Sequence, residues 1–354
     1  MSSMTVSTPT RQPMFAGIDT HKATHHVAVV DADGAVLADQ EFPADADRSV
    51  LAWLSRWPIA RVGVEQTGTY GAGVTRVLTG AGFAVIDVNT PDRTVRATAG
   101  KSDPIDAVMA AHAVRTRRAR VIPKNRDGVI EAIRLLQTAR HSAVKARAAA
   151  LTQLQDLAVI VPSDVRRRVG TTGRSTAAAA LAMRADRTRL HTPTQAAKLA
   201  LRSVATRIRV LDAEIRDLDA ALTEQVTATA PRLLALPQVG IHAAAQLLVT
   251  FGQAPDRISS DAKFARLIGV APIPASSGKT NRMRLHTGGD RQANKVVHLI
   301  AIGRLRSHQP AIDYLTRRQR EGLSKKDAIR AMKRLITREL YGALKADLTA
   351  LDEL

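Results

Sequence analysis

The chain has 354 residues, and its 52 Lys and Arg outnumber its 32 Asp and Glu to give a formal net charge of +20. Because 45% of the residues are apolar, the chain can bury a core, which excludes a wholly disordered basic protein. The lack of cysteine excludes disulfides, thiolate metal sites and cysteine nucleophiles. The sequence has neither an apolar run of about 20 residues that could cross a bilayer nor a hydrophobic signal-peptide core, so we expect a cytoplasmic protein with no membrane partner.

The positive charge is concentrated in the last two thirds of the chain. Residues 1–100 carry 8 Lys and Arg against 10 Asp and Glu, a net charge of −2. Residues 101–230 carry 23 against 12, and residues 231–354 carry 21 against 10, so each of these segments has a net charge of +11. This asymmetry predicts a near-neutral unit followed by basic units that hold nucleic acid, although a generally basic surface would give the same total.

The first ninety residues predict an α/β unit. We expect strands over 14–22, 24–34, 35–43, 61–65 and 83–88, and helices over 45–57 and 73–80. Asp33-Gly34 is a strong signal for a hairpin turn between the second and third strands. An antiparallel meander followed by alternating strands and helices is the element order of an RNase H-like fold, which we therefore expect here.

The rest of the chain predicts helices. From Leu136 onward, Leu or Ala recurs at every seventh residue, which predicts one long helix over 128–161. Apolar residues within 204–222 are spaced four and three apart in alternation, as in a heptad seam. We expect these helices to pair as a coiled coil, within the chain or between subunits, with 162–203 as a helical excursion. A mainly α C-terminal domain is expected to follow.

Four carboxylates form a candidate metal site. Asp19 lies inside the first expected strand, and Glu65 ends the fourth. Asp103 and Asp106 are three residues apart, and the proline between them suits the first turn of a helix, so both would project from one helix face. Carboxylates brought together repel unless a cation is present, and oxygen ligands suit Mg²⁺ or Mn²⁺. Taken singly, Asp103 could be only a helix N-cap and Glu65 only a surface charge.

A second candidate site lies in a loop that contains serine, glycine and basic residues. Residues 273–280 read IPASSGKT, and its last three letters match the end of a P-loop. The first glycine of that motif would fall on Ile273, and no hydrophobic strand leads directly into it, so we reject this interpretation. A serine among Arg and Lys can attack a phosphodiester, because cations and backbone N–H groups stabilise the developing charge. A loop serine is also a common turn former, and the residues alone leave both possibilities open.

Residues 234–243 resemble a helix-hairpin-helix, in which a glycine-containing turn offers backbone N–H groups to phosphates. Gln238 stands where glycine is more usual, and Ile241 replaces a frequent proline. The alternative is a plain helix turn. Arginine clusters, among them Arg304 and Arg306, would add phosphate contacts without reading bases.

Three segments resemble, in order and spacing, the DEDD transposases of the insertion-sequence one-ten family, the bridge-RNA-guided recombinases. They are GIDTHK, GVEQTGTYG and KSDPIDA, and the resemblance extends from about Met14 to Tyr341. It implies a RuvC-like N-terminal domain whose Mg²⁺-binding tetrad is Asp19, Glu65, Asp103 and Asp106. It also implies a coiled-coil region and a C-terminal domain with a nucleophilic serine, which by this match is Ser277, with Ser276 as the fallback. Asp290 follows a Gly-Gly pair where many members have Gly-Asn, which leaves the roles of Asp290 and Asn294 open.

The resemblance also implies an organisation and a function. The expected parts are a disordered N-terminus at 1–12, a RuvC-like domain at 13–122, a helical coiled-coil region at 123–230, a C-terminal transposase domain at 231–346 and a tail at 347–354. The chain would recombine the DNA of its own mobile element through a covalent phosphoserine intermediate, assisted by Mg²⁺ or Mn²⁺ in the tetrad. A structured bridge RNA would choose donor and target DNA, which fits a chain with only 3% aromatic residues to stack on bases.

The expected partners are therefore DNA, a guide RNA and further copies of the chain in a dimer or tetramer, associated with the bacterial nucleoid during the reaction. Expected nucleic-acid contacts are Lys101, Gly240, Lys279, Arg282, Arg284, Arg291 and Lys295. Two alternatives remain from the residues. One is a RuvC-like Mg²⁺-dependent endonuclease or junction resolvase in which water attacks, and the other is a catalytically inactive nucleic-acid-binding relic.

Overall fold

The computed structural model describes residues 12–88, 102–125, 127–170, 174–276 and 283–353. The chain divides into two compact units, Met1–Gly128 and Val129–Leu354, each with its own hydrophobic core. The N-terminal segment expected to be disordered lies, apart from Gln12, outside the described residues. Within the described part of the chain, every helix is too short or too polar to span a membrane.

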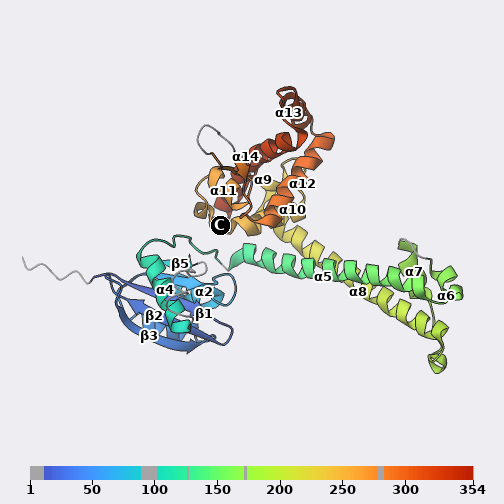
Figure 1. Cartoon of the computed structure of the whole chain (residues 1–354), viewed down its shortest axis with the longest axis horizontal. Coiled ribbons are helices and arrows are strands. Elements are labelled where there is room, and N and C mark those ends of the chain that lie inside the picture. The colour runs from blue at the N-terminus through green and yellow to red at the C-terminus, as the bar shows by residue number, and fades with distance from the viewer. Residues whose placement is uncertain (1–11, 89–101, 126, 171–173, 277–282, 354) are drawn as a thin grey trace, which may run out of the picture. The chain divides into compact units, whose positions relative to one another are not determined.

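A mixed five-stranded sheet forms the centre of the first unit, shown in blue and teal in Figure 1. Its strands are β1 (Met14–Thr20), β2 (Thr24–Val30), β3 (Val36–Pro43), β4 (Ile59–Glu65) and β5 (Val85–Val88). The spatial order is β3-β2-β1-β4-β5, with antiparallel β1–β2 and β2–β3 pairs and parallel β1–β4 and β4–β5 pairs. All five predicted strands and the turn at Asp33-Gly34 are confirmed, and Gly34 has a φ of 102° that only glycine adopts readily.

Helices pack on the two faces of this sheet. On one face, α1 (Asp47–Leu54) and α2 (Ala72–Gly80) bury Leu54 and Leu78 against alternate strand residues that include Ile18. On the other face lies α4 (Asp103–Arg115). A Cβ on Gly17 would lie 2.0 Å from the backbone oxygen of Ala107, and one on Gly63 would lie 2.6 Å from that of Ala110. These two glycines therefore allow α4 to approach the sheet backbone closely.

Two long helices, α5 (Gly128–Ile160) and α8 (Pro193–Thr229), run side by side in opposite directions in the second unit (Figure 1). At one end they share a core with α6 (Ser163–Val169) and α7 (Arg174–Ala182), and the short helix η1 (Arg187–Arg189) precedes α8. At the other end, Ile133 and Leu222 join the C-terminal core. The predicted first helix is confirmed to within a residue, and the two helices pair within the chain. The second begins at Pro193, so it includes the last residues of the segment predicted as a helical excursion.

Ion pairs connect the middle of these two helices. Arg140 pairs with Asp219, and Arg147 pairs with Asp212. Each step of seven residues along α5 is matched by a step of seven in the opposite direction along α8. This spacing keeps the pairing positions on the facing sides of both helices.

Helices also form most of the C-terminal part of the second unit. They are α9 (Pro231–Leu234), α10 (Ile241–Phe251), η2 (Pro255–Arg257), α11 (Asp261–Leu267), α12 (Arg291–Ser307), α13 (Gln309–Arg320) and α14 (Lys325–Asp352), with a two-stranded hairpin of β6 (Pro272–Pro274) and β7 (Met283–Leu285). Phe251, Phe264 and Tyr341 contact one another in the core, with ring centroids 5.5 to 6.2 Å apart.

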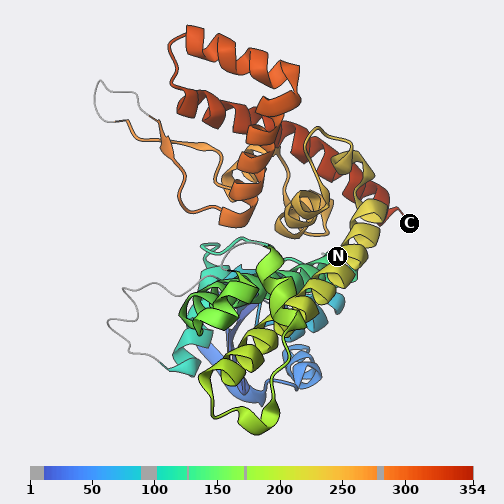
Figure 2. The ribbon, with the colours of Figure 1, turned by 90° about the vertical axis from the view of Figure 1, so that its right-hand side faces the viewer.

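The expected tail at 347–354 is wrong, because α14 continues to Asp352. Leu348 is fully buried in the core. The buried carboxylate of Asp347 accepts hydrogen bonds from the backbone N–H groups of Arg232 at 3.2 Å and Leu233 at 2.9 Å. Figure 2 shows this dark red end of α14 beside the yellow end of α8, where α9 begins.

Candidate functional site

Two acids lie at matching ends of neighbouring parallel strands in the first unit. β1 and β4 pair in register as far as Ile18 and Val64, and Asp19 and Glu65 are the next residue of each strand. Because side chains alternate along a strand, both carboxylates lie on the face that carries Gly17 and Gly63, which is the face covered by α4. Both are buried, and the hydroxyl of Thr20 donates to the backbone oxygen of Glu65 at 3.0 Å.

The other two acids lie on the first turn of α4. The helix begins at Asp103, with proline in its first turn as the sequence predicted, and Asp106 follows three residues later in the same turn. Asp106 is buried, whereas the Asp103 side chain is 43% exposed. Since α4 packs directly on the face that bears Asp19, the sheet and the helix contribute acids to the same region of the first unit.

Electrostatics connect these acids. Burial raises the pKa of Asp19, and the neighbouring carboxylates of Asp106 and Asp103 raise it further, while His21 opposes the rise. A buried carboxylate with acidic neighbours is costly to ionise unless a cation or a hydrogen-bond donor balances it. The local charge balance therefore favours a bound cation.

His21 is a site residue that the sequence hypothesis missed. Its Nε2 lies 3.1 Å from Asp19 Oδ2 and 3.3 Å from Asp103 Oδ1. Among the described residues, Asp19, His21 and Asp103 form a potential metal-binding group, because their ligand atoms all lie within 4.8 Å of one another. Glu65 and Asp106 are not part of this group. The available signal was spacing, because His21 follows Asp19 by two residues and so has the same strand parity.

The donor set fits a hard divalent cation. Carboxylate oxygens with one imidazole nitrogen suit Mg²⁺ or Mn²⁺ better than they suit soft metals, which favour thiolates. Asp19, His21 and Asp103 would hold the ion, with Glu65 and Asp106 as further carboxylates nearby.

The serine segment lies on the β6–β7 hairpin of the second unit. Pro272 pairs with Leu285 and Pro274 with Met283, so residues 275–282 connect the two strands. Ser276 is exposed just after β6. Ser277, Lys279 and Arg282 lie outside the described residues, as does Lys101 in the first unit.

Asp290, whose role was open, caps α12. Its Oδ1 accepts hydrogen bonds from the backbone N–H groups of Gln292 at 2.9 Å and Ala293 at 3.1 Å, and its Oδ2 accepts one from the Thr250 hydroxyl at 2.8 Å. A helix cap is a structural role, which accounts for this aspartate without catalysis. The preceding Gly289 packs against Gly269, since a Cβ on Gly289 would lie 2.2 Å from the Gly269 nitrogen.

Asn294, whose role was also open, links three segments. Its Nδ2 donates to the backbone oxygens of Ile268 and Gly269, both at 2.9 Å. Its Oδ1 accepts a hydrogen bond from the Lys333 ammonium at 2.7 Å. Neither Asn294 nor Lys333 was among the predicted contacts.

The expected helix-hairpin-helix segment forms a turn between α9 and α10. Gln238 has a φ of 63°, in the left-handed region, which explains why glycine is more usual at this position. Its side chain lies against Gly303 of α12. Gly240 is the N-cap of α10, and a Cβ there would meet nothing within 4 Å, so this backbone is open to a ligand.

One expected phosphate contact is wrong. Arg304 is only 3% exposed, its Nε donates to the backbone oxygen of Pro237 at 3.1 Å, and its Nη1 pairs with Glu339 at 2.7 Å. Arg304 therefore fixes the α9–α10 turn onto α12 and α14. The predicted contacts Arg284, Arg291 and Lys295 are exposed, and phosphate binding by them stays a prediction.

Comparison with known families matches both parts of this arrangement. A family model for DEDD transposases of the IS110 type matches residues 16–161, which include all four acids and His21. A second model, described as the transposase IS116/IS110/IS902 family, matches residues 230–316, which include the α9–α10 turn and the β6–β7 hairpin.

A protein described as the insertion element IS900 uncharacterized 42 kDa protein, from Mycobacterium paratuberculosis, is 24% identical over 386 aligned positions. The alignment covers 94% of this chain and 96% of that protein, so the similarity spans both units. The chain therefore belongs to the IS110 family of DEDD transposases, enzymes of insertion-sequence recombination that bind DNA and use divalent metal.

Proposed function

We propose that this transposase recombines its own insertion element through a covalent bond between Ser277 and DNA, with a divalent cation held by the acids of the first unit. The observation that carries the proposal is the convergence of acids from β1, β4 and α4 on one face of the sheet, in a chain whose second unit matches the family's transposase model.

The first unit is proposed to have an RNase H-like fold with a DEDD tetrad of Asp19, Glu65, Asp103 and Asp106. The strand order and the mixed parallel and antiparallel pairing support this assignment. Mg²⁺ or Mn²⁺, when bound there, would supply positive charge to a phosphate undergoing transfer. Asp19, His21 and Asp103 would hold the cation, and the contacts of His21 with both carboxylates bring these three side chains together.

The proposed reaction of the second unit uses Ser277. Its hydroxyl oxygen would form a bond to phosphorus as the bond from phosphorus to a deoxyribose oxygen breaks, and that oxygen would leave with a proton. Basic side chains on the same hairpin, such as Arg284, would stabilise the charge on the phosphate. Rejoining to a different strand would reverse these steps.

Guide RNA and assembly extend the proposal. We infer from the resemblance that a bridge RNA selects donor and target, and that the α5–α8 pair is a coiled coil within a dimer or tetramer. The basic charge of the second unit supports contact with nucleic acid. Sequencing of the RNA that copurifies with the full chain tests the first inference: one structured species is expected, and a mixture of random fragments would contradict it.

Labelled DNA that carries an element end, nicked so that a covalent intermediate is trapped, tests the chemistry. Wild type and the matched control Ser276→Ala are expected to give a protein–DNA adduct on a denaturing gel, and Ser277→Ala none. An adduct that persists in Ser277→Ala would overturn the assignment of the nucleophile. Free DNA ends without an adduct would instead indicate a metal-dependent endonuclease, and binding without any product would indicate an inactive relic.

A further inference from the structure

A cavity of about 410 Å³ lies between α12 and α14, next to the β6–β7 hairpin. Besides Thr287 and Asn294, its polar lining residues are of basic types: Arg291, Lys326, Arg330, Lys333, His286 and His298. Within the described part of the chain, the lining contains no Asp or Glu. Concentrated positive charge in a concave surface attracts an anion, because the walls that exclude water also strengthen the local field.

Lys333 is a partly buried cation of this lining, and its ammonium is held by Asn294. Asn294 accepts a hydrogen bond from its ammonium at 2.7 Å, and Asn294 is itself fixed by two backbone oxygens. An ammonium group has three N–H donors, so two remain for a ligand. Among the described residues Lys333 forms no ion pair, and burial together with the nearby Arg330 lowers its pKa.

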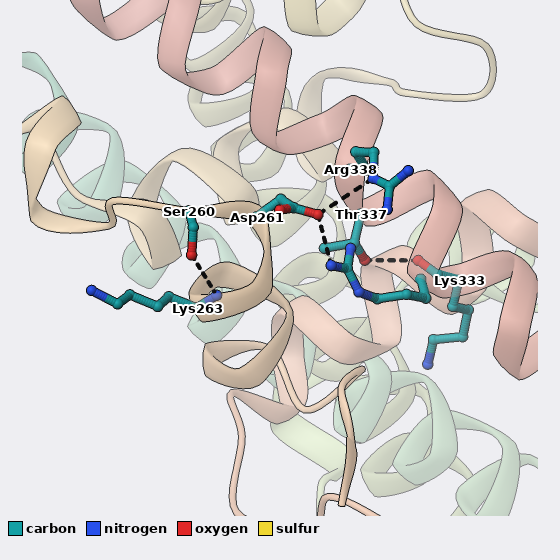
Figure 3. Close-up of polar contacts among 7 residues, drawn as sticks. Ser260, Asp261, Lys263, Lys333, Thr337 and Arg338 are labelled. Carbon is teal, nitrogen blue, oxygen red and sulfur yellow. Dashed lines mark hydrogen bonds and ion pairs between the residues drawn. The ribbon is translucent and has the colours of Figure 1, made fainter.

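Neighbouring basic residues of α14, unlike Lys333, form ion pairs with carboxylates. Arg334 and Arg338 both reach the Asp261 carboxylate, at 2.7 and 3.5 Å, and Arg330 pairs with Asp327 at 2.8 Å. Figure 3 shows Arg338 directed toward Asp261, whereas the Lys333 side chain points away from that aspartate. The charge of Lys333 is thus directed to the cavity and not to a carboxylate of the protein.

His286 contributes a buried polar atom to the lining of the cavity. Among the described residues its Nδ1 is buried and has no hydrogen-bond partner. His286 directly follows β7, whose hairpin carries Ser276 and Ser277 in its connection. The cavity is therefore adjacent in the chain to the segment proposed to attack DNA. A single phosphate group is smaller than this volume, which also has room for an attached sugar.

We propose that this cavity binds a backbone phosphate of the DNA strand presented to the serine segment, with Lys333 and Arg291 as its principal phosphate ligands. The proposal rests on the function proposed above and adds a binding site to it. The Asn294 amide positions the Lys333 ammonium, and the exposed Arg291, at the first turn of α12, also lines the cavity.

The test compares Lys333→Gln with Lys263→Gln in the full chain. Gln at 333 removes the charge but keeps a donor for Asn294. Lys263 is a matched control, because its ammonium contacts Ser259 at 2.7 Å and lies outside the cavity. Binding of a fluorescein-labelled DNA duplex is measured by anisotropy over a range of salt concentrations, since phosphate contacts do not depend on sequence.

Lys333→Gln is expected to weaken DNA binding about tenfold and to reduce the slope of log K against log salt by about 0.9, the contribution of one phosphate. Lys333→Arg is expected to restore the slope, and Lys263→Gln to change neither value. Equal effects of Lys333→Gln and Lys263→Gln would overturn the proposal. If Lys333→Gln does not fold, Arg291→Gln, an exposed change, serves with the same expected outcomes.

Two further arms separate the possible failures. The same titration with an RNA hairpin is expected to be less affected, and a loss confined to RNA would overturn the assignment to DNA. Anisotropy measures DNA binding without cleavage, so its result is independent of the proposed chemistry. If the adduct depends on Ser277 but Lys333→Gln leaves the salt slope unchanged, phosphate binding by the cavity is rejected and the proposed chemistry stands. If Lys333→Gln changes the slope but no adduct forms, phosphate binding by the cavity is supported and the proposed chemistry is rejected.

Discussion

Gly17→Ala tests the close contact between α4 and the sheet. The added Cβ would lie 2.0 Å from the backbone oxygen of Ala107 and 2.3 Å from the nitrogen of Ala111, whereas ordinary contacts begin near 3.4 Å. The helix must therefore retreat by more than 1 Å, because both obstructing atoms belong to its backbone and cannot rotate away. Overpacking of this kind costs about 1–3 kcal/mol, and a backbone obstruction places this change at the upper end, about 3 kcal/mol.

The same retreat would disturb the metal site. Asp19 and Glu65 belong to the sheet, whereas Asp103 and Asp106 move with α4. Mg²⁺ requires nearly ideal octahedral geometry at about 2.1 Å, so a shift of the helix separates its ligands. We expect Mg²⁺ affinity to fall by about tenfold or more, as is typical when the supporting groups of a metal site are displaced.

Fluorescence is a suitable measurement, because the chain has 2 tryptophans and both, Trp53 and Trp57, are in the first unit. Urea unfolding followed by tryptophan emission in EDTA gives the free energy of unfolding of that unit, and calorimetric titration gives the Mg²⁺ affinity. Gly80→Ala is the matched control, since its Cβ would meet nothing within 4 Å and should change stability by less than about 1 kcal/mol. If Gly17→Ala matches this control in both measurements, the inferred contact is wrong.

Three other changes have defined outcomes. Burial raises the pKa of the Asp19 carboxyl in the folded state above its unfolded-state pKa of 3.8. The contribution of Asp19 to folding stability is therefore fully present below pH 3.8, where the carboxyl is protonated, and is lost as the pH rises through the folded-state pKa. Asp19→Asn should therefore be more stable than wild type at pH 7 in EDTA, with a difference that disappears near pH 3, and it should lose the stabilisation by Mg²⁺ that thermal melts show for wild type. Asp347→Ala should lower the free energy of unfolding of the second unit by about 2–3 kcal/mol in urea, because two backbone N–H groups lose a charged acceptor, and a change under 0.5 kcal/mol would contradict the buried cap. A double-mutant cycle on Arg147 and Asp212 should give a coupling of about 0.5–1 kcal/mol, and zero coupling would argue against their pairing.

Local patterns predicted the elements well. Strand alternation, the Asp33-Gly34 turn and the seven-residue repeat from Leu136 each depend on neighbours close in sequence, and each was confirmed. The first turn of α4 was predicted for the same reason, because proline defines a helix start locally. The helix was ended too early in the prediction, because Leu348 and Leu351 continue the apolar spacing beyond Leu344. The contact that holds Asp347 could not be predicted locally, because it is made with α9, more than a hundred residues earlier.

The candidate sites were less accessible from the sequence. The contact of Asn294 with Lys333 joins residues 39 positions apart, and no local pattern indicates it. Arg304 resembles its neighbour Arg306 in sequence, and only the folded structure shows that Glu339 and the Pro237 carbonyl occupy its guanidinium. His21 could be placed on the parity of Asp19, but its approach to Asp103 depends on how α4 packs.

The paired helices α5 and α8 set the distance between the two hydrophobic cores at their ends, and this distance can change only in fixed steps. Their ion pairs repeat every seven residues in both helices, and both ends are anchored in separate cores. Removing or adding seven residues in each helix would keep every facing pair and alter the distance between the two cores by about 10 Å. A change in one helix alone, or by another number, would set arginine against a non-partner. The length of the α5–α8 helical hairpin can therefore change in steps of seven residues. Evolution or design can in this way adjust the distance from the α6–α7 end to the C-terminal core without altering either core.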